Sequence, residues 1–202
     1  LLGPNGAGKT TCFYMITGLI APDHGSIILD GNDITELPMY RRSRLGIGYL
    51  PQEASIFRGL TVENNIRAVL EVVEKSRERR ESILEALLAE FSITHLRRTP
   101  SLALSGGERR RAEIARCLAR NPTVLVLDGA TSALDSKTEA HIEERLRARG
   151  CTSLIVSNRV NSIRDADEIL VLGEGGVAER GTHEELLALK GDYHRLVGGG
   201  DA

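Results

Sequence analysis

The chain has 202 residues, enough for one ordinary domain or for a domain with a subdomain around a sizeable core. Its 41% hydrophobic and 27% charged content excludes fibrous and disordered chains, and its net charge of -2 gives no whole-chain argument for nucleic acid. No apolar stretch approaches the roughly 18 residues that cross a bilayer. Three scattered cysteines without metal-ligand spacing indicate the reduced thiols of a cytosolic protein.

The first half of the chain alternates short strand-like runs with helical ones. A glycine-rich turn leads into an apolar helical run over residues 10–19. Residues 27–29 and 47–50 are predicted to form short strands, because they are apolar and bounded by Gly, Asp and Pro. Residues 61–96 show a charged, helical periodicity with no strand signal. This pattern predicts a helical subdomain, at about 58–104, inserted into an α/β core.

The second half continues the alternation of strands and helices. Its predicted elements are a helix over 105–120, a strand over 124–127, a helix over 136–149, a strand over 153–156, and a hairpin of 169–172 with 177–179. Thr182 and Glu185 form a capping box that begins a last helix, and residues 198–202 are expected to be a flexible tail. Buried strands that alternate with helices predict an α/β fold with a mostly parallel sheet.

The strongest chemical signal lies in residues 3–10, which fit the phosphate-binding pattern G-x-x-x-x-G-K-[ST]. Glycines let backbone N–H groups turn inward around a phosphate, and the following helix points its N-terminus at the same anion. Lys9 would reach the β- and γ-phosphates, and the Thr10 hydroxyl would ligate Mg²⁺. The alternative is a glycine turn that precedes Lys-Thr by chance. The predicted ligand-binding residues are Asn5, Gly6, Ala7, Gly8, Lys9, Thr10 and Thr11.

A second candidate anion site lies where the helix over 105–120 begins. Ser105 is a natural N-cap, and Gly106 and Gly107 beside it leave backbone donors exposed. The functional interpretation is a site that the nucleotide of a partner molecule occupies. The simpler interpretation is an ordinary capped helix.

Two residues at strand ends are candidates for the metal site. Asp128 ends an apolar strand, at the place where open α/β sheets bind ligands, and it is expected to hold Mg²⁺ through water. Gln52 follows another strand and would reach the metal or the attacking water. Either residue alone is more often part of an ordinary turn. The metal-binding interpretation of both residues therefore depends on the presence of the phosphate loop.

In this order the motifs resemble those of the ATP-binding cassette (ABC) transporter ATPases. The matching segments are residues 3–10 (Walker A), Gln52 (Q-loop), 104–108 (signature), Asp128 (Walker B) and 132–135 (D-loop). The resemblance implies a P-loop NTPase core in a single nucleotide-binding domain over 1–197, which binds ATP and Mg²⁺. It also implies a head-to-tail homo- or heterodimer around two ATP molecules, with Asp135 near the nucleotide. Transmembrane subunits would dock on the helical subdomain, at the cytoplasmic face of the plasma membrane.

The chain departs from the family pattern at three positions. Only Leu1 and Leu2 precede the Walker A loop, so the N-terminal strands and the aromatic residue that stacks on adenine are expected to be missing. Gly129 stands where the family has its catalytic glutamate, and Asn158 stands where it has the switch histidine. Removal of a positioned base slows catalysis by a factor of about 10² to 10⁴. We therefore expect an ATP-binding site with impaired hydrolysis.

The two parts of the chain resemble different subfamilies. Residues 1–122 resemble the lipopolysaccharide-export ATPase, whereas 123–197 resemble the nucleotide-binding domains of peptide and bacteriocin exporters. The expected function is an ATP-binding transporter subunit that exports lipid or peptide cargo. One alternative is an ATP-gated clamp that closes without hydrolysis, as the degenerate half of a heterodimer. Chromosome- and repair-type ATPases are disfavoured, because Lys9 and Ser105 are too close in sequence for coiled-coil arms, and no nucleic-acid partner is expected.

Overall fold

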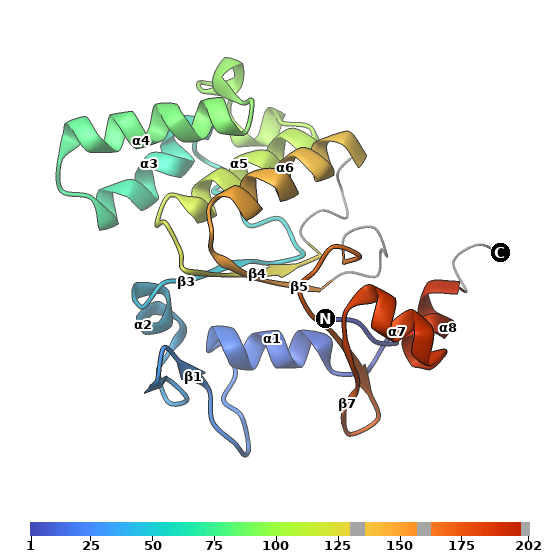
Figure 1. Cartoon of the computed structure of the whole chain (residues 1–202). Helices are drawn as coiled ribbons and strands as arrows, with labels where there is room; N and C mark the ends of the chain where they lie inside the picture. The colour runs from blue at the N-terminus through green and yellow to red at the C-terminus, as the bar shows by residue number, and fades with distance from the viewer. Residues whose placement is uncertain (130–135, 157–162, 199–202) are drawn as a thin grey trace. The chain divides into compact units, whose positions relative to one another are not determined.

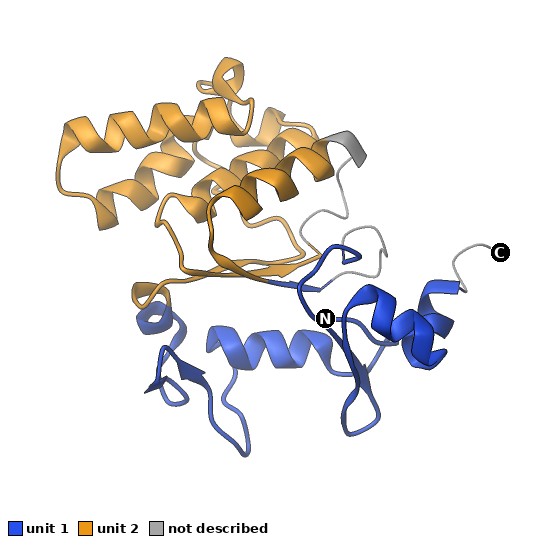
Figure 2. Cartoon of the chain, in the orientation of Figure 1, with its two compact units in different colours: residues 1–42, 154–202 blue, residues 43–153 orange. Residues whose placement is uncertain are grey.

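The computed structural model describes residues 1–129, 136–156 and 163–198 (Figure 1). The chain forms two compact units (Figure 2): unit 1 comprises Leu1–Arg42 and Leu154–Ala202, and unit 2 comprises Ser43–Ser153. Unit 1 contains α1 (Lys9–Thr17), β1 (Ile28–Leu29), β2 (Asn32–Asp33), most of α2 (Met39–Arg44), β6 (Ile169–Gly173), β7 (Gly176–Gly181), α7 (His183–Leu189) and α8 (Asp192–Gly198). Unit 2 contains β3 (Ile47–Leu50), α3 (Val62–Val73), α4 (Arg77–Glu90), η1 (Thr94–Leu96), η2 (Ser101–Ala103), α5 (Gly106–Leu118), β4 (Val124–Asp128), α6 (Ser136–Ala148) and the first residues of β5 (Thr152–Val156).

A parallel pair of strands lies at the centre of unit 2. Strands β3 and β4 pair in parallel from Ile47 with Val124 to Leu50 with Leu127, and the sheet order is β3-β4-β5. The middle of β4 is fully buried, which explains why it is a continuous apolar run rather than an alternating one. Helices α5 and α6 lie over one side of these strands (Figure 1). The predicted α/β fold with a parallel sheet is confirmed.

The predicted helical stretch forms two helices, α3 and α4. Thr61 and Ser76 cap their N-termini, with side chains that accept from backbone N–H groups. Each helix buries leucine or isoleucine side chains that are three or four residues apart, which is the helical spacing of its apolar residues in the sequence. The buried set includes Ile66, Leu70, Leu84, Leu87 and Leu88.

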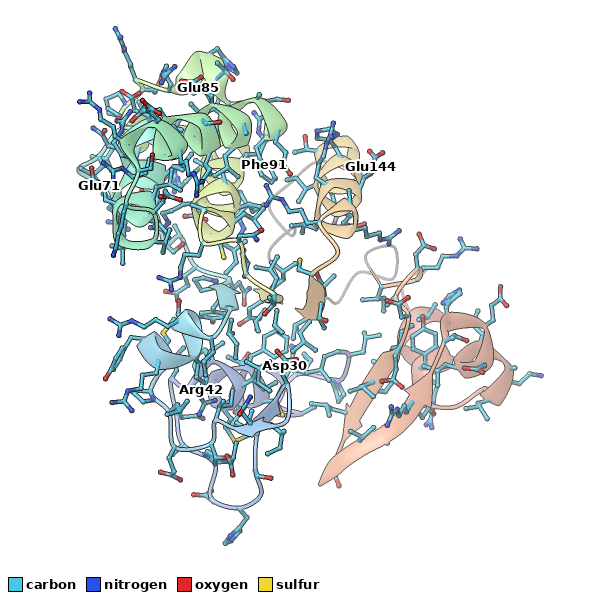
Figure 3. All side chains as sticks on the ribbon, turned by 60° about the vertical axis from the view of Figure 1, so that its left-hand side comes forward. Asp30, Arg42, Glu71, Glu85, Phe91 and Glu144 are labelled. Carbon is cyan, nitrogen blue, oxygen red and sulfur yellow. The ribbon has the colours of Figure 1, made fainter. Side chains whose placement is uncertain are left out.

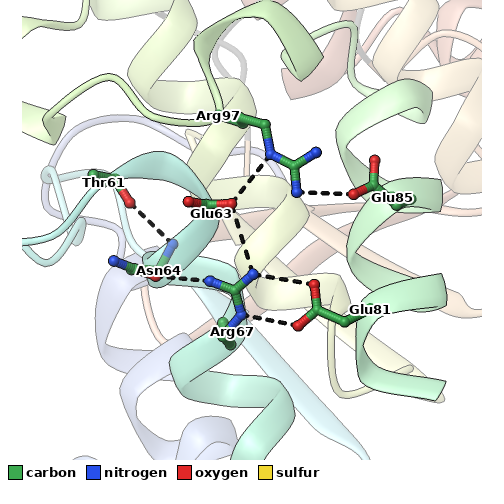
Figure 4. Close-up of polar contacts among 7 residues, drawn as sticks. All are labelled: Thr61, Glu63, Asn64, Arg67, Glu81, Glu85 and Arg97. Atoms are coloured by element: carbon green, nitrogen blue, oxygen red, sulfur yellow. Dashed lines mark hydrogen bonds and ion pairs between the residues drawn. The ribbon is translucent and has the colours of Figure 1, made fainter. Parts of the chain in front are cut away.

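A charge network joins these two helices to the segment after η1 (Figure 4). The Glu63 carboxylate oxygen Oε2 lies 3.6 Å from Arg67 Nη2 and 3.1 Å from Arg97 Nε. Arg67 also pairs with Glu81 at 3.1 Å, and Arg97 pairs with Glu85 at 2.8 Å. Because each arginine serves two carboxylates, ordering one side chain supports two ion pairs, which makes the network more effective than isolated surface pairs.

In unit 1, the residue before the glycine-rich loop takes the place of a strand. Leu2 forms a parallel bridge with Val171, in which its N–H donates to Leu170 O (2.9 Å) and its carbonyl accepts from Leu172 N (2.8 Å). Leu2 is buried in a core that also contains Ile163, Ile169, Val171, Leu186 and Tyr193. Leu2 therefore pairs with β6 as a strand residue would, and this pairing orients the entry to Gly3.

The end of α1 is held by a buried arginine that the sequence did not single out (Figure 3). Arg42 is 1% exposed, and its guanidinium donates to the carbonyls of Ile16 (2.9 Å), Thr35 (2.7 Å) and Leu37 (2.7 Å), as well as that of Met15. The carbonyls of the last helical turn lack partners within the helix and carry negative partial charge. Arg42 satisfies them from outside α1, which has no basic residue in its own last turn.

The C-terminal region differs from the prediction in two respects. The single last helix after Thr182 is two helices, α7 and α8, because Lys190 at the end of α7 adopts a positive φ of 54°. Gly198, assigned to the flexible tail, is the last residue of α8, and residues 199–202 lie outside the described residues. The short strand β2, which pairs with β1, was also not predicted.

Candidate nucleotide-binding site

The glycine-rich loop of unit 1 has the backbone conformation that a phosphate loop requires. Gly6 and Gly8 have φ values of 86° and 88°, a region that side chains other than glycine rarely adopt. No heavy atom lies within 4 Å of the position where a Cβ would be at either glycine, so the space beside the loop is open. At Gly3, by contrast, a Cβ would lie 2.7 Å from the carbonyl oxygen of Leu172, so only glycine fits there.

Lys9 places its positive charge directly on this loop. Its Nζ donates to the carbonyl oxygens of Gly3 (2.6 Å) and Pro4 (2.9 Å). Lys9 is also the first residue of α1, and Gly8 caps the helix without a side-chain hydrogen bond. The helix N-terminus and the ammonium group therefore meet at one loop, as anion binding requires.

The other predicted residues of the loop surround this point. Asn5, Thr10 and Thr11 are exposed, and the N–H of Ala7 donates to the Pro4 carbonyl at 3.2 Å, which closes the turn. Thr10 is therefore exposed in the first helical turn, and the role of its hydroxyl as a metal ligand stays a prediction.

In unit 2, the structure brings Gln52 and Asp128 to the same edge of the sheet. Leu50 and Leu127 are paired, Gln52 follows Leu50 by two residues, and Asp128 follows Leu127 directly. Asp128 is 5% exposed, whereas Gln52 is exposed. Ligands bind at this carboxyl edge of parallel strands, and carboxylate and amide oxygens suit Mg²⁺.

The metal donors that the sequence predicts are chemically consistent with Mg²⁺. Hydroxyl, amide and carboxylate oxygens from Thr10, Gln52 and Asp128 are hard ligands, and Mg²⁺ usually takes only one or two carboxylates and keeps several waters. Within the described ranges, no cluster of three or more His, Cys, Asp and Glu residues forms a separate metal site.

Gly129 follows Asp128 with a φ of 54°, in the left-handed region. A glutamate at this position would have to adopt that strained conformation. Asn158, predicted to stand in place of the switch histidine, and Asp135, predicted to belong to the D-loop, lie outside the described residues.

The signature segment forms a well-defined helix start. Ser105 is the N-cap of α5 and makes a capping box with Glu108, whose carboxylate accepts from Ser105 N at 2.8 Å. The hydrogen bond from the Ser105 side chain lowers the pKa of Glu108 below its ordinary value, and the bond from the backbone N–H adds to this effect. Ser105 and Gly106 are exposed, and Gly107 is half-buried. The capped helix is confirmed, and the anion site of the partner's nucleotide stays a prediction.

The predicted residues thus form two groups. The phosphate loop belongs to unit 1, whereas Gln52, Ser105 and Asp128 belong to unit 2. Sequence reasoning missed Glu113, a buried carboxylate of α5 that contacts the loop after Gln52. The sequence offers one signal for it: Glu113 is an ionisable residue beside the apolar residues Ala112 and Ile114 of the predicted helix over 105–120.

Comparison with known proteins decides the family. The family model described as "ABC transporter" matches residues 1–132. The chain belongs to the ABC transporter family. It is an ATP-binding domain of that family, and none of the helices among its described residues is long and apolar enough to span a membrane.

Similar proteins occur in several bacteria. An uncharacterized ABC transporter ATP-binding protein of Rhizobium meliloti (strain 1021) is 55% identical over 200 residues, which are 97% of this chain and 74% of the relative. The lipopolysaccharide export system ATP-binding protein LptB of Haemophilus influenzae is 47% identical over 192 residues, 93% of this chain and 80% of the relative. The resemblance to the lipopolysaccharide-export ATPase is confirmed.

Solved structures show the same fold. A bacterial Atm1-family ABC exporter with ATP bound aligns with the whole ABC domain at a TM-score of 0.87 and 33% identity, and the domain spans 36% of that chain. A dimeric ATP-binding cassette in a post-hydrolysis state, bound to ADP and Pi, aligns with 90% of the domain at a TM-score of 0.79 and 27% identity. The domain covers 83% of that chain.

Proposed function

We propose that this ABC domain binds Mg-ATP and couples the binding to export of cargo by transmembrane subunits. The observation that carries the proposal is the phosphate loop, where Lys9 Nζ donates to the carbonyls of Gly3 and Pro4 beside a helix start whose N-cap, Gly8, makes no side-chain hydrogen bond. Thr10, Gln52 and Asp128 would hold Mg²⁺, which supplies charge neutralisation at the β- and γ-phosphates.

Three further parts of the proposal concern the dimer, the membrane partner and the cargo. The solved cassette that resembles this chain is a dimer, which supports an ATP-dependent dimer in which Ser105, Gly106 and Gly107 complete the partner's site, with Asp135 beside it. The similar solved chain belongs to an ABC exporter, and this domain spans 36% of it, which supports a membrane-transport partner. We propose that this partner consists of transmembrane subunits, on which the domain docks at the cytoplasmic face of the membrane. The LptB relatives favour lipid cargo of the lipopolysaccharide type, and peptide cargo is the alternative.

Hydrolysis is proposed to be slow. Gly129 cannot polarise the attacking water, and Asn158 cannot carry a proton. The same two residues favour the second candidate function, an ATP-gated clamp that serves as the degenerate half of a heterodimer. A phosphate-release assay beside an active ABC ATPase separates the two functions, because a clamp shows ATP-dependent dimerisation without turnover.

The experiment that tests the proposal is calorimetric titration of the whole chain with ATP in the presence of Mg²⁺. Lys9→Ala removes a charge-assisted contact of about 1.5–3 kcal/mol, so ATP affinity should fall roughly tenfold or more. Lys75→Ala removes a lysine at an exposed position of unit 2 and is the matched control. Equal ATP affinities of Lys9→Ala and the unchanged protein would refute the proposal.

A further inference from the structure

Glu113 is a buried carboxylate of α5 that the nucleotide site does not use. It is 1% exposed. A buried carboxylate is unfavourable unless hydrogen-bond donors surround it. Both of its oxygens have donors: Oε1 accepts from the backbone N–H groups of Ser55 (2.7 Å) and Ile56 (3.0 Å), and Oε2 accepts from Arg110 Nη1 (3.0 Å).

The segment over residues 55–57 is thus held by side chains of neighbouring helices. The next N–H along the chain, that of Phe57, donates to Oδ1 of buried Asn65 on α3 at 2.8 Å. Arg116 of α5 adds two contacts, because its Nη2 donates to Ser55 Oγ at 2.8 Å and its guanidinium lies 4.5 Å from the centre of the Phe57 ring. Three consecutive backbone donors are therefore satisfied by side chains rather than by a strand or a helix.

This anchored segment begins three residues after Gln52. Only residues 51–54 separate the end of β3 from Ser55. The Gln52 side chain is exposed and hydrogen-bonds to no described residue, so its own contacts do not fix its position. One end of the short loop is fixed by the pairing of β3 with β4, and the other end by Glu113. Gln52 therefore lies in a short loop whose two ends are both anchored.

We propose that Glu113 is a positioning residue, which fixes the reach of Gln52 toward the metal ion of bound Mg-ATP. The inference rests on the proposed function, because it needs a nucleotide-bound Mg²⁺. If Glu113 only stabilised unit 2, its loss would lower stability and leave the Mg²⁺ requirement unchanged. Positioning instead predicts a changed Mg²⁺ requirement in a folded protein.

The test measures binding of a fluorescent ATP analogue to the whole chain as Mg²⁺ is titrated. Glu113→Ala should raise the Mg²⁺ concentration for half-maximal binding on the order of 10-fold, as expected for loss of a group that orients a metal ligand. Gln52→Ala should raise it similarly, and the double variant no further. Glu90→Ala is the matched control, since Glu90 pairs with Arg149 and does not contact the loop.

Two conservative variants test separately the length and the charge of the Glu113 side chain. They remain informative if Glu113→Ala fails to fold. Glu113→Gln keeps an oxygen that can accept from the Ser55 and Ile56 N–H groups, so its Mg²⁺ requirement should stay near that of the unchanged protein. Glu113→Asp keeps the charge but is one methylene too short, so it should behave like Glu113→Ala. The reverse result for these two variants would overturn the inference.

Two other results would also overturn it: an unchanged Mg²⁺ requirement in Glu113→Ala and Glu113→Asp, or a double variant with Gln52→Ala that shows the product of the two single effects. Failure of the proposed function is recognised separately. In that case Lys9→Ala would bind the analogue as tightly as the unchanged protein, whereas failure of the Glu113 inference leaves the Lys9→Ala defect intact.

Discussion

The most informative perturbation is at Gly129, where a left-handed backbone conformation coincides with the proposed absence of a catalytic carboxylate. Its φ of 54° lies in the left-handed region, where a residue with a Cβ is destabilised by about 1–2 kcal/mol. Gly129→Ala and Gly129→Glu should both lower the free energy of unfolding by this amount. For a chain of this length, each kcal/mol corresponds to about 2–4 °C in melting temperature.

Of these two variants, only Gly129→Glu should raise the rate of ATP hydrolysis. A carboxylate directly after Asp128 would orient the attacking water, so Gly129→Glu should raise kcat above that of Gly129→Ala. Adding Asn158→His should bring the gain to on the order of 10²-fold, near the lower end of what a positioned base supplies. KM should change little, because neither group is needed to bind the ground state of the nucleotide.

The assay is phosphate release at saturating Mg-ATP, with urea unfolding of each variant. Gly129→Ala is the matched control, since it has the backbone strain without the carboxylate. If Gly129→Ala loses no stability, the positive φ does not require glycine. If Gly129→Glu is folded and binds ATP but turns over no faster than Gly129→Ala, the missing carboxylate does not limit hydrolysis.

Three further outcomes are expected. Arg42→Met should lower the free energy of unfolding by about 3 kcal/mol, measured in urea, because it leaves several partly buried carbonyls without the donor that buried Arg42 supplies. Ser105→Arg should abolish the ATP-dependent dimer seen by light scattering, because a large cation would occupy the place of the partner's nucleotide. Burial raises the pKa of the Cys117 thiol to about 11 from an ordinary value of 9.0. Since the unfolded chain releases this proton first, stability should fall as pH rises from about 9 to 11, and the fall should be smaller in Cys117→Ala.

Controls for these outcomes lie nearby in the chain. Arg41→Met removes an exposed arginine beside Arg42 and should change stability little, and Ser82→Arg adds the same charge at an exposed position of α4. Equal losses in Arg41→Met and Arg42→Met, or a dimer that persists in Ser105→Arg, would contradict the reasoning. An alkaline decline that is unchanged in Cys117→Ala would show that another group causes it.

The sequence by itself predicted most of the helices and strands and all the residues proposed for the nucleotide site. The phosphate loop is readable because its glycines, Lys9 and Thr10 are contiguous, and Asp128 because it ends an apolar run. Helix starts at Ser105 and Thr182 were also predicted, because a capping box involves only residues three apart. Each of these signals depends on local spacing, which the chain carries whatever its tertiary structure.

The tertiary structure decided which distant groups satisfy one another. Arg42 reaches carbonyls of α1 that are 26 and 27 positions away, and Glu113 reaches N–H groups that are 57 and 58 positions away. Neither pairing can be predicted from the spacing of nearby residues, because a buried polar group is stabilised by whichever donors or acceptors the fold brings to it. The positive φ of Gly129 belongs to the same class, since glycine is compatible with many conformations and only the folded backbone at the end of β4 selects this one.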